Sequence, residues 1–589
     1  MRILRVDLRR FRGFEAATVL PAGHVVLVGE PGGGRTDLIE GLERVFSPEA
    51  TRARVPTELD FFRSDKSQRA EVEVVVGDLP ETLEQAFLDH LEVWDRERRE
   101  SVDAFADPEQ IDKKKYDFIV RLCYRAVWNE NEDHAEHWVD YPKTSDPDEG
   151  RFDRVARADR ELLPFAVVHG RGRALDLGVR GSFRRLVDLA DGGDFQGAME
   201  RLGERIEELA GRFSATAQMS ASLEQMLSPV RVSLGLEGIP AAEIVRFLPE
   251  GGSLTGLMRS LGPAMDLRDG VGFLPLHRHG STLSGMLGVA QALATVGGGG
   301  IVAVDDFGES LDNATTLHLA AMLRRSASQV WLSTRRAGAA EAFTPAELVR
   351  LARVEGKRVV YHGRPPKTRR ERLVSRQRGL QLLPAVGSRA VIVLEGPHDR
   401  AALWTLAIRL FYDEGVPMPA AHGISLIDSG SVDGAGGSTG VARLAQAARE
   451  IGLRAISVLD HDGADTQAVA ELEENAKAAD AVVRLPKGHA IERALVEGLD
   501  DEIVRAAMAE LEGAFGLTLP KEWNALSGHE LRRVVMGALK QAGGLHAQFI
   551  LALPAKCYPP VAREVLKQAV AVAAKAAAGT LAEKAVVQL

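Results

Sequence analysis

Several features are scarce in this sequence, and each scarcity excludes a class of protein. The 589 residues include only two cysteines, Cys123 and Cys557, which are too few for a disulfide framework and lack the spacing of a zinc site. Charged residues interrupt the apolar runs well before bilayer length, and the first residues lack the apolar core of a signal peptide. We therefore expect a cytoplasmic protein that does not enter a membrane.

An excess of positive charge is also missing, since the formal net charge is -10 at pH 7. This sum does not exclude nucleic-acid binding, because affinity follows local basic patches and recruited metal ions. One basic patch lies at residues 364–378, and the Pro-Pro pair within it marks a domain boundary. The patch is either a solvated interdomain linker or a strip that contacts phosphates through Lys367, Arg369 and Arg370.

Apolar residues are abundant. Hydrophobic residues make up 45% of the chain, which is enough to bury several cores and predicts at least two domains. Continuous apolar runs of strand length recur in both halves. They predict an α/β protein with buried parallel strands.

Carboxylates directly follow two of these runs in the second half of the chain. The run at residues 390–394 precedes Glu395 and Asp399, and a later run precedes Asp460 and Asp462. Because the carboxyl ends of parallel strands meet at one edge of a sheet, these side chains are expected to converge. Several hard oxygen ligands suit Mg²⁺ or Mn²⁺, and a divalent-metal site of this type suits phosphodiester chemistry.

A glycine-rich segment in the first half predicts a nucleotide site. Residues 29–36 follow a strand-like run and precede a helix-like stretch, and they match a P-loop except that Arg35 stands where lysine is expected. Gly29 and Gly34 allow backbone N–H groups to close around phosphates at a helix N-terminus, and Thr36 would hold Mg²⁺. ATP is the expected ligand of this half.

The other parts of an ATPase appear later and in order. Residues 301–306 read as a Walker B strand that ends in Asp305 and Asp306, Ser281 lies in a segment typical of an ABC signature, and a further strand ends at Arg335. With the opening strand and its Phe-Arg-Gly-Phe turn, this order resembles an SMC- or RecF-like ABC ATPase head.

Three positions depart from that pattern. The wide fork of Arg35 replaces a compact ammonium, Asp306 stands where a longer glutamate aligns water, and Arg335 stands where a histidine senses the γ-phosphate. We therefore expect this half to bind ATP, or to keep the fold for dimerisation, and to hydrolyse ATP slowly or not at all.

A long insertion separates the two parts of the head. Apolar residues recur in it at helical spacing, and a packed helical hairpin accounts for them: Met199, Leu202, Ile206, Leu209 and Phe213. In related heads such an insertion is a dimerisation element, so the resemblance implies a homodimer or higher homo-oligomer.

An ABC-type head followed by the lone Glu and Asp-x-Asp of a Toprim core resembles the OLD (overcoming lysogenisation defect) nucleases, including the nuclease subunit of Gabija-type anti-phage systems. The resemblance implies that Glu395 and Asp399 serve one metal site and that Asp460 and Asp462 serve the other or both. Glu492 occupies the place of the family's later acidic residue.

Some of these assignments have structural alternatives. Asp399 also suits an ordinary helix cap, Glu492 a solvent-facing helical position, and His461 a loop filler. The family carries a lysine near the end of the Toprim domain, and Lys540, His546 and Lys556 compete for that place.

The expected organisation is an α/β chain with an ABC/SMC-like P-loop head, a helical insertion, and a Toprim domain with C-terminal helices. The expected bounds are 1–149 and 271–363 for the head, 150–270 for the insertion, 364–386 for the basic linker, 387–500 for the Toprim core and 501–589 for the helical end.

The resemblance implies a metal-dependent endonuclease that nicks or cleaves DNA in defence against phage or plasmid, with a helicase or other defence partner left open. An RNA nuclease is an alternative, because metal chemistry alone does not discriminate the sugar. The second alternative is a non-catalytic SMC-like scaffold that senses nucleotide.

Overall fold

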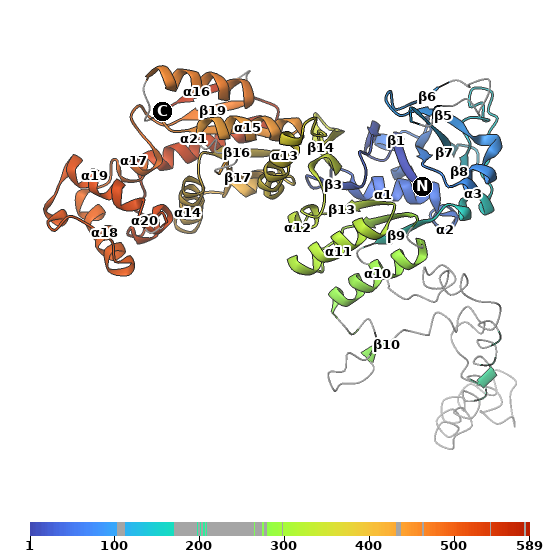
Figure 1. Ribbon diagram of the computed structural model, residues 1–589, viewed down its shortest axis with the longest axis horizontal. Coiled ribbons are helices and arrows are strands. Elements are labelled where there is room, and N and C mark those ends of the chain that lie inside the picture. The colour runs from blue at the N-terminus through green and yellow to red at the C-terminus, as the bar shows by residue number, and fades with distance from the viewer. Residues whose placement is uncertain are drawn as a thin grey trace, which may run out of the picture.

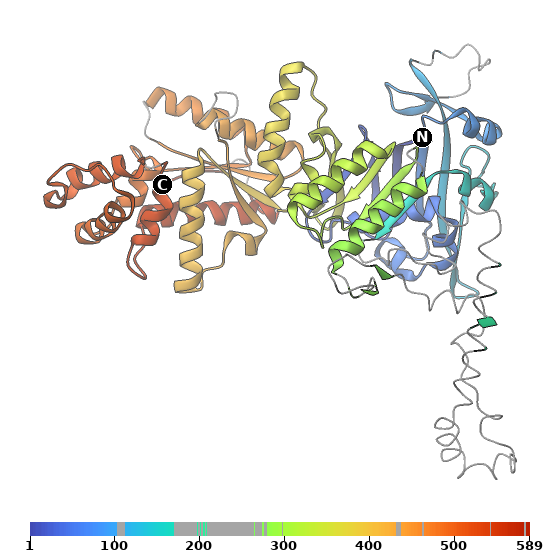
Figure 2. The same ribbon diagram turned by 60° about the horizontal axis from the view of Figure 1, so that its bottom comes forward.

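The chain folds into two lobes that lie side by side, with the N-terminal half in one and the C-terminal half in the other (Figures 1 and 2). The computed structural model describes residues 1–102, 114–169, 280–296, 299–430, 437–461, 465–541, 543–581 and 585–589, with isolated positions between 112 and 278. Met199, Leu202, Ile206, Leu209 and Phe213, on which the expected helical hairpin rests, lie outside the described residues.

The first sheet of the N-terminal lobe is antiparallel and contains seven strands. Its order is β2-β1-β4-β7-β5-β6, with β8 paired to β7. The bounds are β1 (Arg2–Phe11), β2 (Phe14–Val19), β4 (Ala70–Gly77), β5 (Glu92–Asp95), β6 (Glu100–Val102), β7 (Tyr116–Asn129) and β8 (His134–Asp140). The short helices α2 (Pro48–Ala53), α3 (Glu81–Ala86) and α4 (Arg157–Leu162) accompany it.

The second sheet of this lobe carries the P-loop segment. Its order is β15-β14-β3-β13-β12-β9, and every pairing is parallel except that of β14 with β15. The strands are β3 (Val25–Gly29), β9 (Phe165–His169), β12 (Ile301–Asp305), β13 (Gln329–Ser333), β14 (Leu348–Val354) and β15 (Lys357–His362). A separate two-stranded sheet joins β10 (Ala264–Met265) to β11 (Leu274–Pro275).

The second sheet is buried on both faces, which explains its continuous apolar strands. Val25 and Leu27 pack with the first sheet and α1 (Arg35–Phe46) in one core, whereas Val26 and Val28 pack in another. That other core contains residues of α10 (Ser281–Val296), α11 (Asn313–Ser326) and α12 (Ala337–Ala340). Helix α1 therefore lies between the two sheets.

The expected boundary of the insertion at residue 150 is too early. Strand β9 pairs in parallel with β12, from Phe165 opposite Ile301 to His169 opposite Asp305. The N-terminal lobe thus continues through residue 169, because this short apolar run completes the edge of the second sheet. The sequence prediction missed the run because its partner strand is far away along the chain.

The C-terminal lobe is built on a five-stranded parallel sheet in the order β17-β16-β18-β19-β20. The strands are β16 (Ala390–Leu394), β17 (Ile424–Asp428), β18 (Arg454–Leu459), β19 (Ala481–Arg484) and β20 (Ala585–Gln588). One core combines residues of α14 (Pro397–Glu414) and α21 (Pro560–Ala577), and the other contains residues of α15 (Ser438–Glu450) and α16 (Asp465–Ala478).

A helical end joins the first of these cores. It contains α17 (Ile491–Val496), α18 (Asp501–Phe515), α19 (Gly528–Leu539) and α20 (His546–Ala552). The expected helical end at 501–589 also contains a strand, because β20 returns to the edge of the sheet and pairs in parallel with β19. Its residues alternate between half-buried and exposed, as in an edge strand.

The predicted basic linker at 364–386 contains a regular helix, α13 (Arg369–Leu382). The Thr368 hydroxyl accepts a hydrogen bond from the Glu371 N–H, and the Glu371 carboxylate accepts one from the Thr368 N–H. This reciprocal capping box stabilises a helix start that the charge run alone did not reveal.

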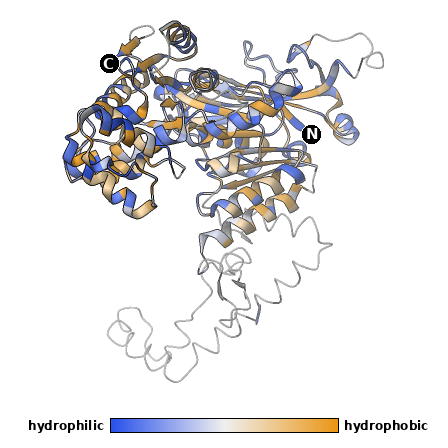
Figure 3. Cartoon of the chain, turned by 60° about the vertical axis from the view of Figure 1, so that its left-hand side comes forward, coloured by the Kyte–Doolittle hydropathy of each residue, from blue (hydrophilic) through white to orange (hydrophobic). Residues whose placement is uncertain are grey.

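Hydrophobic residues are concentrated along the strands of the central sheets, and the surrounding helices carry both hydrophobic and hydrophilic residues (Figure 3). Among the described residues, none of the helices combines the length and apolar character that a bilayer crossing requires.

A buried arginine joins the two lobes. Arg350, on β14 beside the P-loop strand, is only 2% exposed. Its guanidinium donates to the carbonyls of Ser388 at 2.7 Å, Gly452 at 2.9 Å, Val386 at 3.1 Å and Ile451 at 3.4 Å. Burial lowers the pKa of Arg350 to about 10, so the side chain stays charged at neutral pH.

We expect Arg350→Met to lower the free energy of unfolding by about 3 kcal/mol, because it leaves buried carbonyl oxygens without donors. Urea denaturation measures the change. The matched control is Arg364→Gln, which removes an exposed pair with Glu450 across the same two lobes at 3.6 Å and is expected to change the free energy by less than about 1 kcal/mol. Equal small effects of both substitutions would contradict the assigned role of Arg350.

Candidate functional site

The P-loop segment forms a tight turn between β3 and α1. Gly29, Gly32 and Gly34 have φ of 133°, 76° and 100°, in the region that favours glycine. A side chain on Gly29 would also lie 2.0 Å from the carbonyl oxygen of Leu351 on β14. The sequence therefore requires glycine here for both conformation and space.

The hydroxyl and carboxylates predicted to serve a nucleotide's metal lie together. Thr36, in the first turn of α1, has its hydroxyl 3.3 Å from Asp305 Oδ1, and the same oxygen accepts a hydrogen bond from Ser333 at 2.5 Å. The Ser333 hydroxyl in turn accepts the Asp306 N–H at 2.9 Å. The start of α1 is thus joined to the ends of β12 and β13 at one edge of the sheet.

Arg35 turns into the protein. Its guanidinium donates to the carbonyls of Gly29 at 2.7 Å and Thr334 at 3.5 Å. Burial and the nearby positive charge of Arg335 lower the pKa of Arg35. In this conformation Arg35 links the loop to the end of β13. A P-loop lysine at this position is expected to contact phosphates instead.

The remaining predicted nucleotide residues lie at the same edge or on α10. Arg335 pairs with Asp306 at 3.8 Å and with Glu309 at 3.5 Å, so two of the departures from the ATPase pattern neutralise each other. Ser281 is exposed in the first turn of α10. In the described part of the chain, no hydrogen bond or ion pair joins Ser281 to the P-loop.

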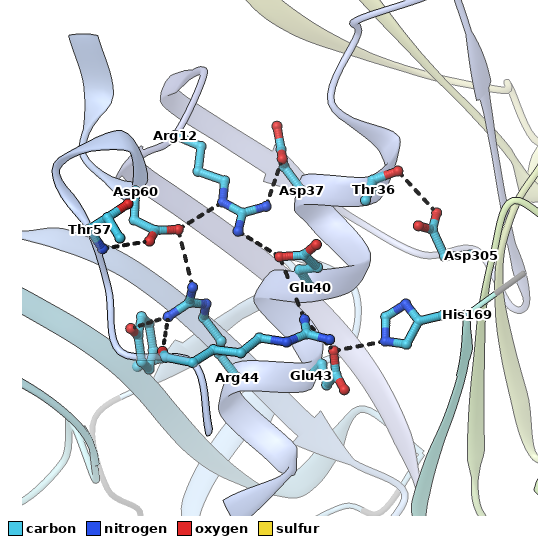
Figure 4. A network of polar contacts seen from close by, with 12 residues as sticks. Arg12, Thr36, Asp37, Glu40, Glu43, Arg44, Thr57, Asp60, His169 and Asp305 are labelled. Atoms are coloured by element: carbon cyan, nitrogen blue, oxygen red, sulfur yellow. Dashed lines mark hydrogen bonds and ion pairs between the residues drawn. The ribbon is translucent and has the colours of Figure 1, made fainter. Parts of the chain in front are cut away.

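A half-buried ionic network beneath the P-loop was not predicted from the sequence (Figure 4). Arg12 contacts Asp37 at 2.9 Å, Glu40 at 2.5 Å and Asp60 at 2.9 Å, and Arg44 contacts Asp60 at 3.1 Å. These residues come from the turn after β1, from α1, and from the turn before β4. The network fixes α1, and hence the loop that begins it, against the first sheet.

His169 extends this network toward the metal edge. It ends β9 opposite Asp305 and lies 3.1 Å from Glu43 (Figure 4). The hydrogen bond with Glu43 raises the pKa of His169. The signal in the sequence is the strand-like Phe-Ala-Val-Val-His run, which the sequence prediction places in the insertion.

In the C-terminal lobe, the ends of β16 and β18 bring Glu395 and Asp460 together. The strands pair in parallel, and Glu395 Oε1 accepts the Asp460 N–H at 3.0 Å. The Ser429 hydroxyl, just after β17, donates to the Glu395 carbonyl at 2.7 Å. Gly437 faces the other carboxylate oxygen of Glu395, where a Cβ would lie 3.5 Å from it.

Asp399 lies in the first turn of α14 and caps it. Its Oδ2 accepts the Gly396 N–H at 2.9 Å, as the capping alternative predicted. Burial raises the pKa of Asp399 to about 6, and the negative charges of Glu492 and Asp428 act in the same direction. Capping does not preclude a ligand role, because the other carboxylate oxygen has no part in that bond.

Glu492 does not face solvent. Lys540 lies 3.2 Å from it and His546 3.3 Å from it, both at Oε1, whereas Lys556 is exposed elsewhere. Burial opposes ionisation, but the contacts with His546 and Lys540 lower the pKa of Glu492 to about 2. The ring of His398 stacks on that of His546 with centroids 5.1 Å apart, so this group adjoins the start of α14.

Asp428 is an acidic residue at this edge to which the sequence analysis gave no role. It ends β17 opposite Leu394. Its carboxylate pairs with Arg400 of α14 at 3.2 Å. The signal in the sequence is its position directly after an apolar run, as for Glu395 and Asp460.

His461 is buried and is held through its backbone. Its N–H donates to the His489 carbonyl at 2.8 Å, and its own carbonyl accepts the Gly488 N–H at 2.7 Å. The loop after β18 is therefore tied to the loop before α17. This placement agrees with the loop-filling alternative for His461.

Asp462, the second aspartate of the predicted pair, lies outside the described residues. Within the residues that are described, no group of three or more His, Cys, Asp or Glu side chains is arranged to hold a metal ion. The predicted set is therefore brought together in part, with Glu395 and Asp460 in contact and Asp399 near Glu492.

The basic helix lies close to this edge. Lys367 and Arg369 are exposed at the start of α13, and the side chain of Arg370 lies outside the described part. At the other end of the helix, the Gln381 amide donates to the Ser429 carbonyl at 2.7 Å. Ser429 also bonds Glu395, so α13 ends beside the predicted nuclease residues.

No known protein-family profile and no curated protein matches this chain. Among solved structures, an SMC head bound to the C-terminal winged-helix domain of ScpA is 12% identical, with 61% of this chain and 97% of that chain covered and a TM-score of 0.30.

Two further SMC heads give the same degree of likeness. The SMC head domain from Thermotoga maritima is 12% identical, with 62% of this chain and 100% of that chain covered and a TM-score of 0.28. The Smc head with an extended coiled coil, bound to the C-terminal domain of ScpA derived from Pyrococcus furiosus, is 12% identical, with 61% and 95% covered and a TM-score of 0.32.

We expect Glu492→Gln to lower the free energy of unfolding by about 1.5 kcal/mol at pH 7, because the ionised carboxylate is stabilised in the folded state. The folded pKa of about 2 lies below the ordinary value of 4.5, so this stability is present above pH 4.5 and is lost as the pH falls toward 2. Denaturant unfolding of both proteins at a series of pH values measures it. A difference between them that does not shrink on acidification would contradict the assignment.

Proposed function

We propose that the chain is a divalent-metal-dependent nuclease with a regulatory nucleotide-binding head. The contact between Glu395 and Asp460, at the carboxyl ends of adjacent parallel strands, carries this proposal. Both residues directly follow buried strands, and the contact places the Glu395 carboxylate against the backbone of Asp460. The arrangement matches what a Toprim site requires of its first glutamate and first aspartate.

The donor chemistry of this edge fits Mg²⁺ or Mn²⁺. Glu395, Asp399 and Asp460 supply hard oxygen atoms, and Asp462 is the proposed further ligand. A divalent ion bound there would stabilise the charge that develops when a phosphodiester is cleaved. In this site the Asp460 N–H orients the Glu395 carboxylate, and the Ser429 hydroxyl holds the Glu395 backbone carbonyl.

Glu492, Lys540 and His546 form the other wall of the proposed site. Lys540 is an exposed cation held by Glu492, so it is placed to contact a phosphate that approaches Asp399. His546 is buried and orients Glu492. Of the three residues that competed for a helping role, Lys540 and His546 both fit this wall.

DNA is the proposed substrate, and α13 is the proposed entry strip. Lys367 and Arg369 are exposed cations on a segment whose far end bonds Ser429 beside Glu395. A phosphate backbone that follows this helix would be led to the carboxylate edge. A homo-oligomeric assembly, a helicase or other defence partner, and a role against phage or plasmid DNA are parts of the proposal that rest on the family resemblance.

The head is proposed to bind Mg²⁺ and ATP and to hydrolyse ATP slowly. Thr36 and Asp305 lie 3.3 Å apart, as a metal held between the P-loop and the Walker B strand requires. Arg335, paired with Asp306 and Glu309, replaces the histidine expected there. These departures favour nucleotide binding as a signal over rapid turnover.

The nuclease proposal predicts that the purified protein nicks supercoiled plasmid in the presence of Mn²⁺ or Mg²⁺. Glu395→Gln and Asp460→Asn should each lower the rate about 100-fold or more, because each removes charge at the site where the transition state is stabilised. Glu510→Gln is the matched control, since Glu510 is exposed on α18, and it should cleave like the natural chain. Activity that survives the first two changes would contradict the proposal, and cleavage of structured RNA alone would assign RNA as the substrate.

Nucleotide binding is tested separately by calorimetry with ATP and Mg²⁺. Thr36→Val should weaken binding about tenfold, because it removes one charge-assisted contact to the metal. Thr295→Val is the control, since the hydroxyl of Thr295 bonds within its own helix to the Gln291 carbonyl. Equal affinities of the natural chain and Thr36→Val would show that the P-loop is not the nucleotide site.

A further inference from the structure

One carboxylate in the P-loop, that of Glu30, contacts the C-terminal lobe. Glu30 follows Gly29 and is only 3% exposed. Its Oε1 accepts the Arg353 N–H on β14, and its Oε2 accepts Arg389 Nε at 2.9 Å. Arg389 belongs to the other lobe, where it directly precedes β16.

Arg389 lies at the opposite end of the strand that carries Glu395. Its N–H donates to the Gly423 carbonyl at 2.8 Å, just before β17. Strand β16 is five residues long and completely buried, and it connects Arg389 directly to Glu395. A shift of Arg389 would therefore reach the proposed nuclease edge through the backbone of this strand.

The P-loop around Glu30 lies close to the segment that precedes β16. The Gly29 carbonyl oxygen lies 3.8 Å from the place that a Cβ on Gly387 would take, so the P-loop touches the segment before β16. Arg350 holds the same segment through the carbonyls of Val386 and Ser388. In Figure 1, β3 and β14 lie on the side of the head that faces β16 and β17.

We propose that Glu30 is a positioning residue that couples the P-loop to β16 through Arg389. When phosphates bind the backbone N–H groups of the P-loop, the loop would shift and displace Glu30. Arg389 would move with Glu30, because separating the pair would leave a buried carboxylate without its cation. The coupling is reciprocal, so a change at β16 alters the P-loop by the same free energy. The inference rests on the proposed nucleotide and nuclease sites, but the contact itself is testable without either activity.

The test is amide hydrogen exchange of the full chain followed by mass spectrometry. Arg389→Gln should raise exchange in residues 29–36, and Glu30→Gln should raise it in residues 390–396, each by about fivefold or more. The double variant should show the same exchange as each single variant, because both substitutions remove the same contact between Glu30 and Arg389. Arg364→Gln is the control, since it breaks an exposed pair between the same lobes that does not involve the P-loop.

ATP with Mg²⁺ provides the second reading. It should change exchange at residues 390–396 in the natural chain and in Arg364→Gln, and leave it unchanged in Glu30→Gln and Arg389→Gln. The proposal would be overturned if exchange in residues 29–36 of Arg389→Gln and in residues 390–396 of Glu30→Gln equalled that of Arg364→Gln. It would also be overturned if ATP still changed exchange at residues 390–396 in Glu30→Gln and Arg389→Gln. Arg389→Lys keeps the charge, so its amide exchange in residues 29–36 should lie between that of the natural chain and that of Arg389→Gln. This variant replaces Glu30→Gln in the test if Glu30→Gln does not fold.

Plasmid cleavage by the same proteins separates this inference from the proposed function. Coupled exchange with no cleavage by any protein would overturn the nuclease and leave the coupling standing. Cleavage without coupled exchange would overturn the coupling alone.

Discussion

In a parallel sheet every strand points the same way, so the residues that follow neighbouring strands meet at one edge. Both candidate sites of this chain depend on that constraint. In the head it brings Thr36 to Asp305, and in the C-terminal lobe it brings Glu395 to Asp460. Neither pair is close in sequence, and each is held by backbone pairing that is buried on both faces.

The charges at these two edges are managed differently. In the head, Arg335 pairs with Asp306 and Arg35 donates to the Gly29 carbonyl, so both arginines are engaged with protein atoms. At the second edge, Glu492 is neutralised by Lys540 and His546, whereas burial holds the pKa of Asp399 near 6. A cation bound beside Asp399 would favour the ionised carboxylate, which burial disfavours.

Short-range patterns sufficed to predict the P-loop turn and the strands that lead to Asp305, Glu395 and Asp460. These features depend on local glycine and on continuous apolar runs. The pattern failed at β9 and β20, because the partner of an edge strand lies far away in the sequence. It also failed for Arg350, Glu30 and Arg389, since a charged residue shows no sign in the sequence of the buried carbonyls or carboxylate that it meets.

The central claim is that Glu395 and Asp460 hold a divalent metal. Anomalous diffraction from crystals grown with Mn²⁺ tests it most directly, because it locates the ion without any assumption about substrate. The account predicts a manganese peak about 2 Å from carboxylate oxygens of Glu395 and Asp460. Manganese found only between Thr36 and Asp305, with none at the second edge, would contradict it.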